Sequence, residues 1–176
     1  MPGAAIGIEL NLGYPGTVSR SVDTIITARK LQSKIEGDKE TASPILFGEA
    51  VILNGDNTYS KFGEGNAAND FVGIAVREVK QTIDYYSSAG AYLPNETMDV
   101  LNRGSITVNC NNGTPTAGGK VYIRIKENPA IPNGKVGQCE AISDAENTIE
   151  IPNLKWATNK LDKNRVAEIT ILTRTI

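Results

Sequence analysis

Few residues of this sequence could do chemistry, and their spacing matches no catalytic or metal-binding motif. The chain contains no histidine, which is the usual general base near neutral pH and the commonest zinc ligand. Its absence excludes Ser-His-Asp and Cys-His catalysis as well as histidine-based metal sites. Catalysis by carboxylates, lysine or tyrosine stays open.

Acidic and glycine-rich stretches fall short of the patterns that bind ions or nucleotides. The acidic stretches 56–58 and 144–146 lack the alternating ligands and terminal glutamate of a helix-loop-helix calcium site. Gly63-x-Gly65 lacks the third glycine and the Lys-Ser/Thr step of phosphate loops. The 20 acidic residues are spread evenly, and the single tryptophan, Trp156, is expected in the core. We therefore expect no cofactor, no metal and no catalysis, with a carboxylate-based polysaccharide hydrolase as the enzymatic alternative.

The two cysteines, Cys110 and Cys139, form no metal-binding or redox motif. The first interpretation is two small buried apolar residues, because free cysteine is among the most buried residue types. A disulfide between the two is the alternative.

Length and charge limit the classes of partner. The chain has 176 residues and a net charge of −2, so one domain with a real core is expected, without a basic surface for nucleic acid. Met1-Pro2-Gly3-Ala4-Ala5 shows no charged region ahead of a long apolar run. We expect no secretory signal, no membrane segment, and synthesis in a cytosol.

Several stretches alternate apolar and polar residues with the two-residue period of a half-buried strand. Their apolar positions are Val72, Ile74 and Val76; Ile106, Val108 and Cys110; Val121, Ile123 and Ile125; Ile149 and Ile151; and Ala167, Ile169 and Ile171. Turn signals separate them at Asn54-Gly55, Asn112-Gly113, Gly118-Gly119 and Asn133-Gly134. The pattern predicts an all-β fold: a single compact β-barrel or β-sandwich domain with an extended N-terminal segment and long loops.

One range and one residue give local predictions about strands. Residues 23–35 are the best helical candidate, but their apolar spacing is poor, so we predict extended structure with helix as the alternative. Pro152 should end the strand that starts at Ile149.

Glycines and polar stretches give further predictions. Gly73 interrupts an apolar run, which indicates a bend or a close backbone approach. Gly104 precedes a strand and predicts a chain reversal. Residues 36–43 predict a solvated loop, and residues 62–69 a flexible connection.

The first 20 residues form a segment apart from the main domain, residues 21–176. Ile6, Ile8, Leu10 and Leu12 alternate with small or polar residues until Pro15 and Gly16 indicate a tight turn. The segment is either a first strand or an arm that adds to another subunit's sheet edge. Candidate capsid or intersubunit contacts are Leu10, Leu12, Tyr14, Tyr85, Tyr86 and Tyr92. For the last three tyrosines, a place over the domain's own core is the alternative.

Segments along nearly the whole chain resemble one family, the structural cement proteins of tailed-phage heads. The resembling segments are residues 13–20, 47–51, 57–59, 70–80, 92–106, 118–122 and 166–171. The resemblance implies a small β-barrel or β-sandwich protein, often a homotrimer, that binds the major capsid protein on the outer surface of the expanded head. It implies stabilisation of the virion shell against internal DNA pressure, with no catalysis, no direct nucleic acid and no membrane. Another phage component, such as a tail, fibre or receptor-binding module, is the alternative.

Overall fold

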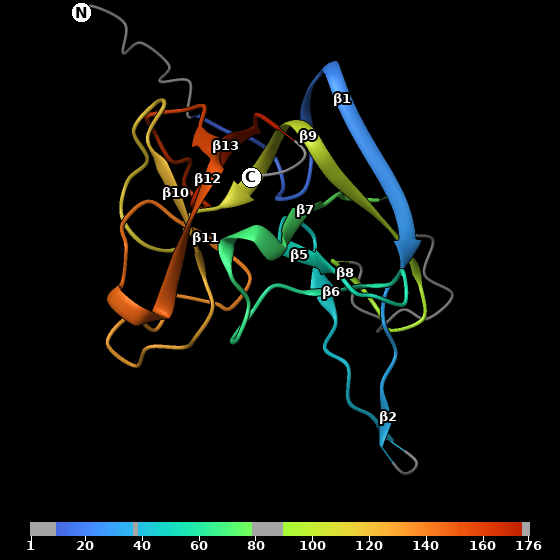
Figure 1. Cartoon of the computed structure of the whole chain (residues 1–176). Coiled ribbons are helices and arrows are strands. Elements are labelled where there is room, and N and C mark those ends of the chain that lie inside the picture. The colour runs from blue at the N-terminus through green and yellow to red at the C-terminus, as the bar shows by residue number, and fades with distance from the viewer. Residues whose placement is uncertain (1–9, 37–38, 79–89, 174–176) are drawn as a thin grey trace, which may run out of the picture.

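The computed structural model describes residues 10–36, 39–78 and 90–173, and most of their regular structure is β-strand (Figure 1). The strands are β1 Val18–Lys30, β2 Ile35–Glu36, β3 Lys39–Glu40, β4 Ile45–Leu46, β5 Ala50–Leu53, β6 Tyr59–Lys61, β7 Phe71–Ala75, β8 Ala91–Tyr92, β9 Thr97–Asn109, β10 Lys120–Arg124, β11 Cys139–Glu140, β12 Thr148–Trp156 and β13 Val166–Ile171. Two 3-10 turns, η1 Ala68–Asp70 and η2 Ala145–Asn147, are the only helical elements described. Neither turn has the length or apolar character needed to cross a membrane. The predicted all-β fold is confirmed.

Strand β9 lies at the centre of the main sheet. It pairs antiparallel with β1 along Thr97–Ile106, with β13 along Gly104–Asn109, and with β7 at Val100 and Leu101. The full strand order is β11-β10-β12-β13-β9-β7-β5-β6, with β1 added on β9. Figure 1 shows the β10–β13 lobe in orange and red beside the green and teal strands β5 to β7, with β9 joining them.

Two apolar clusters lie on opposite faces of the central strands. Leu101 and Ile74 pack into the first cluster, with the inward side chains of β10, β12 and β13. Their neighbours Val100 and Ala75 pack into the second, around Tyr59. Both faces of β7 and β9 are therefore buried at these positions, which explains why β7 is apolar along its whole length.

A parallel seam closes the curled sheet at its β11 edge. Cys110 directly follows β9 and forms an isolated parallel bridge with Cys139 of β11. The backbone N–H of Asn111 donates to the Cys139 carbonyl at 3.2 Å, and that of Ala141 donates to the Asn112 carbonyl at 2.9 Å. Strands β9, β13, β12, β10 and β11 thus form a small barrel. Both cysteines are free and buried, which confirms the first interpretation of them.

Most predicted strands are present. The apolar positions of the 106–110 and 167–171 runs are buried as expected, in β9, at Cys110 directly after it, and in β13. Residues 23–30 belong to β1, so extended structure is confirmed over helix there. Trp156 ends β12 and is 1% exposed, in the core as predicted.

Two predictions about strand ends are wrong. Pro152 does not stop β12, which continues to Trp156. The pairing of β12 with β10 shifts register between Lys120 and Tyr122, and such an irregularity tolerates a proline that cannot donate a hydrogen bond. Gly104 marks no chain reversal, because β9 runs through it and pairs it with Ile171.

Two predicted loops have more structure than expected. Strands β2 and β3 pair as a short exposed hairpin, so the described part of the 36–43 region is solvated but includes regular structure. The 62–69 connection begins at the fully buried Phe62 and leads into η1, where the Asp70 carboxylate accepts the N–H of Ala67. Side-chain hydrogen bonds and one apolar anchor organise this stretch.

Gly73 provides the close backbone approach that its position predicts. A Cβ atom there would lie 2.2 Å from the Leu101 carbonyl oxygen in β9. The β5–β7 pairing shifts register beside it, between Val51 and Ile52. The absence of a side chain lets β7 lie against β9.

Replacing Gly73 by alanine should therefore destabilise the fold by about 3 kcal/mol, because backbone atoms of β9 cannot move away cheaply. Gly55→Ala is the matched control, since its Cβ would meet nothing within 4 Å. Urea unfolding of both variants measures the difference. Equal stabilities would contradict the close approach.

Candidate interaction surface

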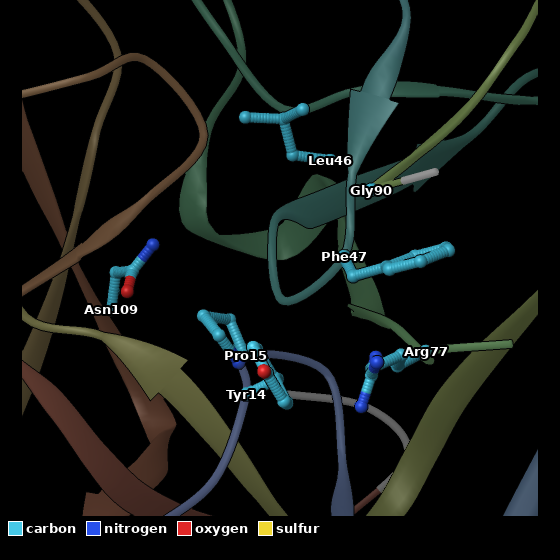
Figure 2. Close-up of a pocket in the computed structure, with 7 residues that line it drawn as sticks. All are labelled: Tyr14, Pro15, Leu46, Phe47, Arg77, Gly90 and Asn109. Atoms are coloured by element: carbon cyan, nitrogen blue, oxygen red, sulfur yellow. The ribbon is translucent and has the colours of Figure 1, made fainter. Parts of the chain in front are cut away.

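A groove of about 320 Å³ lies beside the turn at Tyr14–Gly16 (Figure 2). Its lining residues are Tyr14, Pro15, Leu46, Phe47, Arg77, Gly90 and Asn109. They come from segments far apart in the sequence, and apolar side chains dominate. Tyr14 is 65% exposed and Leu46 41% exposed, so two large apolar surfaces face solvent here.

Hydrogen bonds to β9 fix the wall of the groove that carries Tyr14. The Thr107 hydroxyl donates to the Tyr14 carbonyl at 2.7 Å, and the Gly16 N–H donates to the Thr107 carbonyl at 2.7 Å. Gly16 has φ +82°, and a Cβ there would lie 2.9 Å from that of Phe47. The turn predicted from Pro15 and Gly16 is confirmed, and its backbone is held against the sheet.

A cation stacked on an aromatic ring forms the polar part of the groove. The Arg77 guanidinium carbon lies 4.3 Å from the centre of the Tyr14 ring. The backbone N–H of Arg77 also donates to the Gly16 carbonyl at 2.7 Å. Within the described part of the chain, no carboxylate forms an ion pair with Arg77. The ring of Tyr14 and the Gly16 carbonyl thus fix the position of Arg77.

The buried Glu49 holds the Leu46–Phe47 side of the groove. Its carboxylate accepts the Leu46 N–H at 2.9 Å and pairs with the Lys61 ammonium at 2.8 Å. It also accepts the side-chain amide of Gln138 at 3.2 Å. Gln138 in turn accepts the Asn111 amide at 2.6 Å, so this polar chain links the groove to the barrel seam.

The predicted contact residues lie in different environments. Tyr14 lies on the groove, Leu10 is 42% exposed, and Leu12 is partly buried with its N–H on the Asp162 carboxylate at 3.2 Å. Tyr92 is fully buried and donates its hydroxyl to the Val76 carbonyl at 2.7 Å, so it belongs to the domain's own core.

The remaining predicted contacts, Tyr85 and Tyr86, lie outside the described residues. Leu46 and Arg77 line the groove but were not among the predicted contacts. In the sequence, Arg77 beside Glu78 could form a surface or intersubunit pair within the resembling segment 70–80, whereas Leu46 is marked only by its adjacency to segment 47–51.

A second exposed feature is the β2–β3 hairpin, which projects from the body of the molecule (Figure 1). Ile35 on it is 66% exposed. The Glu40 carboxylate accepts the N–H groups of Lys34 and Ala42 at 2.8 and 2.9 Å, and the Thr41 N–H donates to the Lys34 carbonyl at 2.7 Å. Hydrogen bonds from the Ser33 hydroxyl and from the backbone N–H groups of Ala42 and Lys34 lower the pKa of Glu40. Together these contacts stiffen the base of the hairpin.

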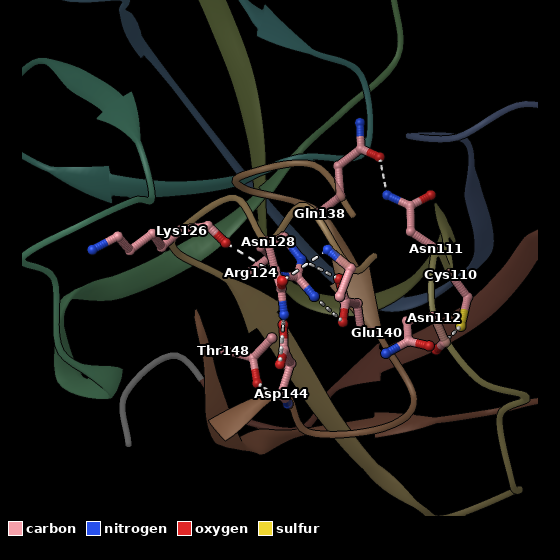
Figure 3. A network of polar contacts seen from close by, with 11 residues as sticks. Cys110, Asn111, Asn112, Arg124, Lys126, Asn128, Gln138, Glu140, Asp144 and Thr148 are labelled. Carbon is pink, nitrogen blue, oxygen red and sulfur yellow. Dashed lines mark hydrogen bonds and ion pairs between the residues drawn. The ribbon is translucent and has the colours of Figure 1, made fainter. Parts of the chain in front are cut away.

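A buried ion cluster supports the β10–β12 lobe (Figure 3). The side chains of Arg124 and Glu140 are both fully buried and make a two-point contact, with Nη2 to Oε2 at 2.9 Å. Arg124 also donates to Asp144 at 2.8 Å and to the Lys126 carbonyl at 3.1 Å. Burial opposes its charge, but the acidic partners outweigh that cost and raise the pKa of Arg124.

The cluster also orders the loop that follows β10. Asn128 donates to the Asp144 carboxylate at 3.0 Å, and hydrogen bonds from Asn128 and Arg124 lower the pKa of Asp144. The Asp144 N–H donates to the Thr148 hydroxyl at 2.8 Å. Arg124 lies wholly inside the protein, so the cluster is built as a structural clamp. In the described ranges, no group of three or more His, Cys, Asp or Glu side chains is arranged to hold a metal ion.

Breaking the clamp on one side should be costly. Arg124→Met leaves the Glu140 carboxylate buried without its cation, and we expect a loss of about 3–5 kcal/mol in unfolding free energy. The double variant with Glu140→Met should recover most of that loss, because no buried charge is left unpaired. Chemical denaturation of all four members of the cycle measures this.

The matched control is the exposed pair of Lys120 and Glu150, which are 2.8 Å apart. Lys120→Met should cost less than about 1 kcal/mol, since solvent screens that pair. Equal costs at Lys120 and Arg124 would refute the clamp.

Comparison with known proteins identifies the family. The model of the XM1 gp53 minor capsid protein family matches residues 3–171. A chain of the solved structure "The capsid of Myoviridae Phage XM1" has a TM-score of 0.67 and 16% sequence identity, covering 96% of this chain and 94% of that chain. At that identity the structural likeness supports the fold alone. No curated protein matches. On the match to the family model, this chain belongs to the XM1 gp53 minor capsid protein family, a family of phage capsid components.

Proposed function

We propose that this chain is a cement, or decoration, protein that binds the outer surface of the expanded phage head and stabilises the shell against internal DNA pressure, without catalysis. Its membership of a minor capsid protein family is the observation that carries the proposal. The rigid exposed groove and the projecting hairpin support it, because a clip needs surfaces that are ordered before they bind.

The groove is the proposed contact with the major capsid protein. Tyr and Arg dominate the energetics of protein interfaces, and here Tyr14 and Arg77 stack on each other beside the exposed Leu46. A capsid segment with an acidic side chain next to an apolar one would fit both the Arg77 guanidinium and the apolar wall. Leu10 and Leu12 extend the same contact along the N-terminal segment, which we propose as a capsid-binding or intersubunit arm.

The mechanism is thermodynamic. A protein that binds the assembled shell and not its free subunits stabilises the shell by mass action. Several weak contacts per oligomer act together through their effective concentration, so a homotrimer would hold neighbouring capsid subunits far more tightly than one copy could. The hairpin at Ile35 offers a second contact for this purpose.

Purified protein should co-sediment with empty expanded heads and not with free capsid subunits. Its copy number per virion, measured by quantitative mass spectrometry, should reach the hundreds expected of a shell component. No binding at saturating protein would refute the cement role. A few copies per virion would instead favour a tail, fibre or receptor-binding component.

Tyr14→Ala and Arg77→Glu should each weaken shell binding at least about tenfold, which corresponds to roughly 1.4 kcal/mol. Both side chains are exposed and the turn is held by its backbone, so the melting temperature should stay unchanged. Lys160→Glu, an exposed charge reversal away from the groove lining, is the matched control. Unchanged shell affinity for both groove variants would exclude the groove as the contact.

A further inference from the structure

We infer that Cys110 and Cys139 are a site of reversible oxidation, at which a disulfide staples the barrel seam. The two residues are direct partners in a parallel bridge. Neighbouring strands lie about 4.8 Å apart, and partner side chains leave such a pair on the same side. A disulfide requires Cα atoms about 4.4–6.8 Å apart, so the bridge already meets that requirement.

The backbone on both sides of the seam keeps the two thiols together. The Cys110 N–H donates to the Arg165 carbonyl at 2.9 Å, which ties it to the turn before β13. Cys139 pairs with Ile123 of β10, and its carbonyl accepts the Asn111 N–H. Both side chains are fully buried in the first apolar cluster. The Cys110 thiol donates to the Asn112 carbonyl at 3.4 Å, and it would give up that contact when the bond to Cys139 forms.

The reaction balances with a small-molecule disulfide, such as oxidised glutathione, as the oxidant. One cysteine thiolate attacks a sulfur atom of the oxidant, forming a mixed disulfide and expelling one small-molecule thiolate. The second cysteine thiolate then attacks the protein sulfur of the mixed disulfide and expels the other. Two protein thiols lose two electrons, the oxidant gains them, and the two protons pass to the expelled thiolates.

The seam resists this reaction while it is closed. Burial raises the pKa of Cys110 to about 11 and raises that of Cys139 still further, so thiolate is scarce at neutral pH. Oxidation of the folded protein is therefore slow and depends on opening at β11, a strand of only 2 residues. The bond then closes the chain between residues 110 and 139, which constrains the unfolded state.

Refolding the full chain in a mixture of reduced and oxidised glutathione tests the geometry without the barrier of burial. We expect one intramolecular disulfide, seen as a mass lower by two hydrogens and as a Cys110–Cys139 linked peptide. The oxidised protein should melt at least about 5 °C higher than the same sample after dithiothreitol, since a disulfide commonly adds a few kcal/mol.

Single variants supply the control. Cys110→Ala and Cys139→Ala should each show the same melting temperature in both redox conditions. Should either variant fail to fold, peptide mapping of the unsubstituted protein reads the bond directly. Two free thiols in the refolded protein, stable glutathione adducts, or disulfide-linked dimers would each overturn the inference.

Discussion

Strand β9 pairs with three other strands, β1, β7 and β13, and the arrangement of the rest of the structure depends on these pairings. Its first part pairs with β1 and β7, and its last part with β13. Val100 and Leu101 face different apolar clusters. Because side chains alternate along a strand, a slip of one residue would exchange the two faces and place the wrong side chains in both clusters at once. The close approach of Gly73 to Leu101 adds a steric limit on the same register.

Buried polar groups also connect the β10–β13 lobe with the strands on the other side of β9. Glu49 lies just before β5 and binds Gln138 just before β11, so one buried carboxylate joins the two lobes. The same carboxylate holds the Leu46 backbone at the groove. An unpaired buried carboxylate would be costly, so the Lys61 and Gln138 contacts must form together with the fold. The shape of the exposed groove is therefore coupled to the packing of the interior.

The sequence predicts what depends on local period and turn chemistry. The runs around Ile106 and Ile169 alternate cleanly and are strands, and Gly73 marks a close approach. Contacts between segments far apart in the sequence cannot be predicted from local residue patterns. Arg124 occupies the polar side of an alternating run, yet it is fully buried because Glu140 and Asp144 from later segments neutralise it. Tyr14 is a predicted contact, whereas Leu46 joins it only through the tertiary fold.

The groove and the hairpin owe their rigidity to different interactions, and this matters for the proposed function. The groove is fixed by hydrogen bonds to Thr107 of β9, so its order follows from the central sheet. The hairpin is stiffened locally by Glu40, independently of the core. A partner that binds either surface spends little free energy on ordering it. Two preformed surfaces on one chain can engage two neighbouring subunits, and the second contact then forms at high effective concentration. Modest individual contacts would be enough for a clip that holds a shell together.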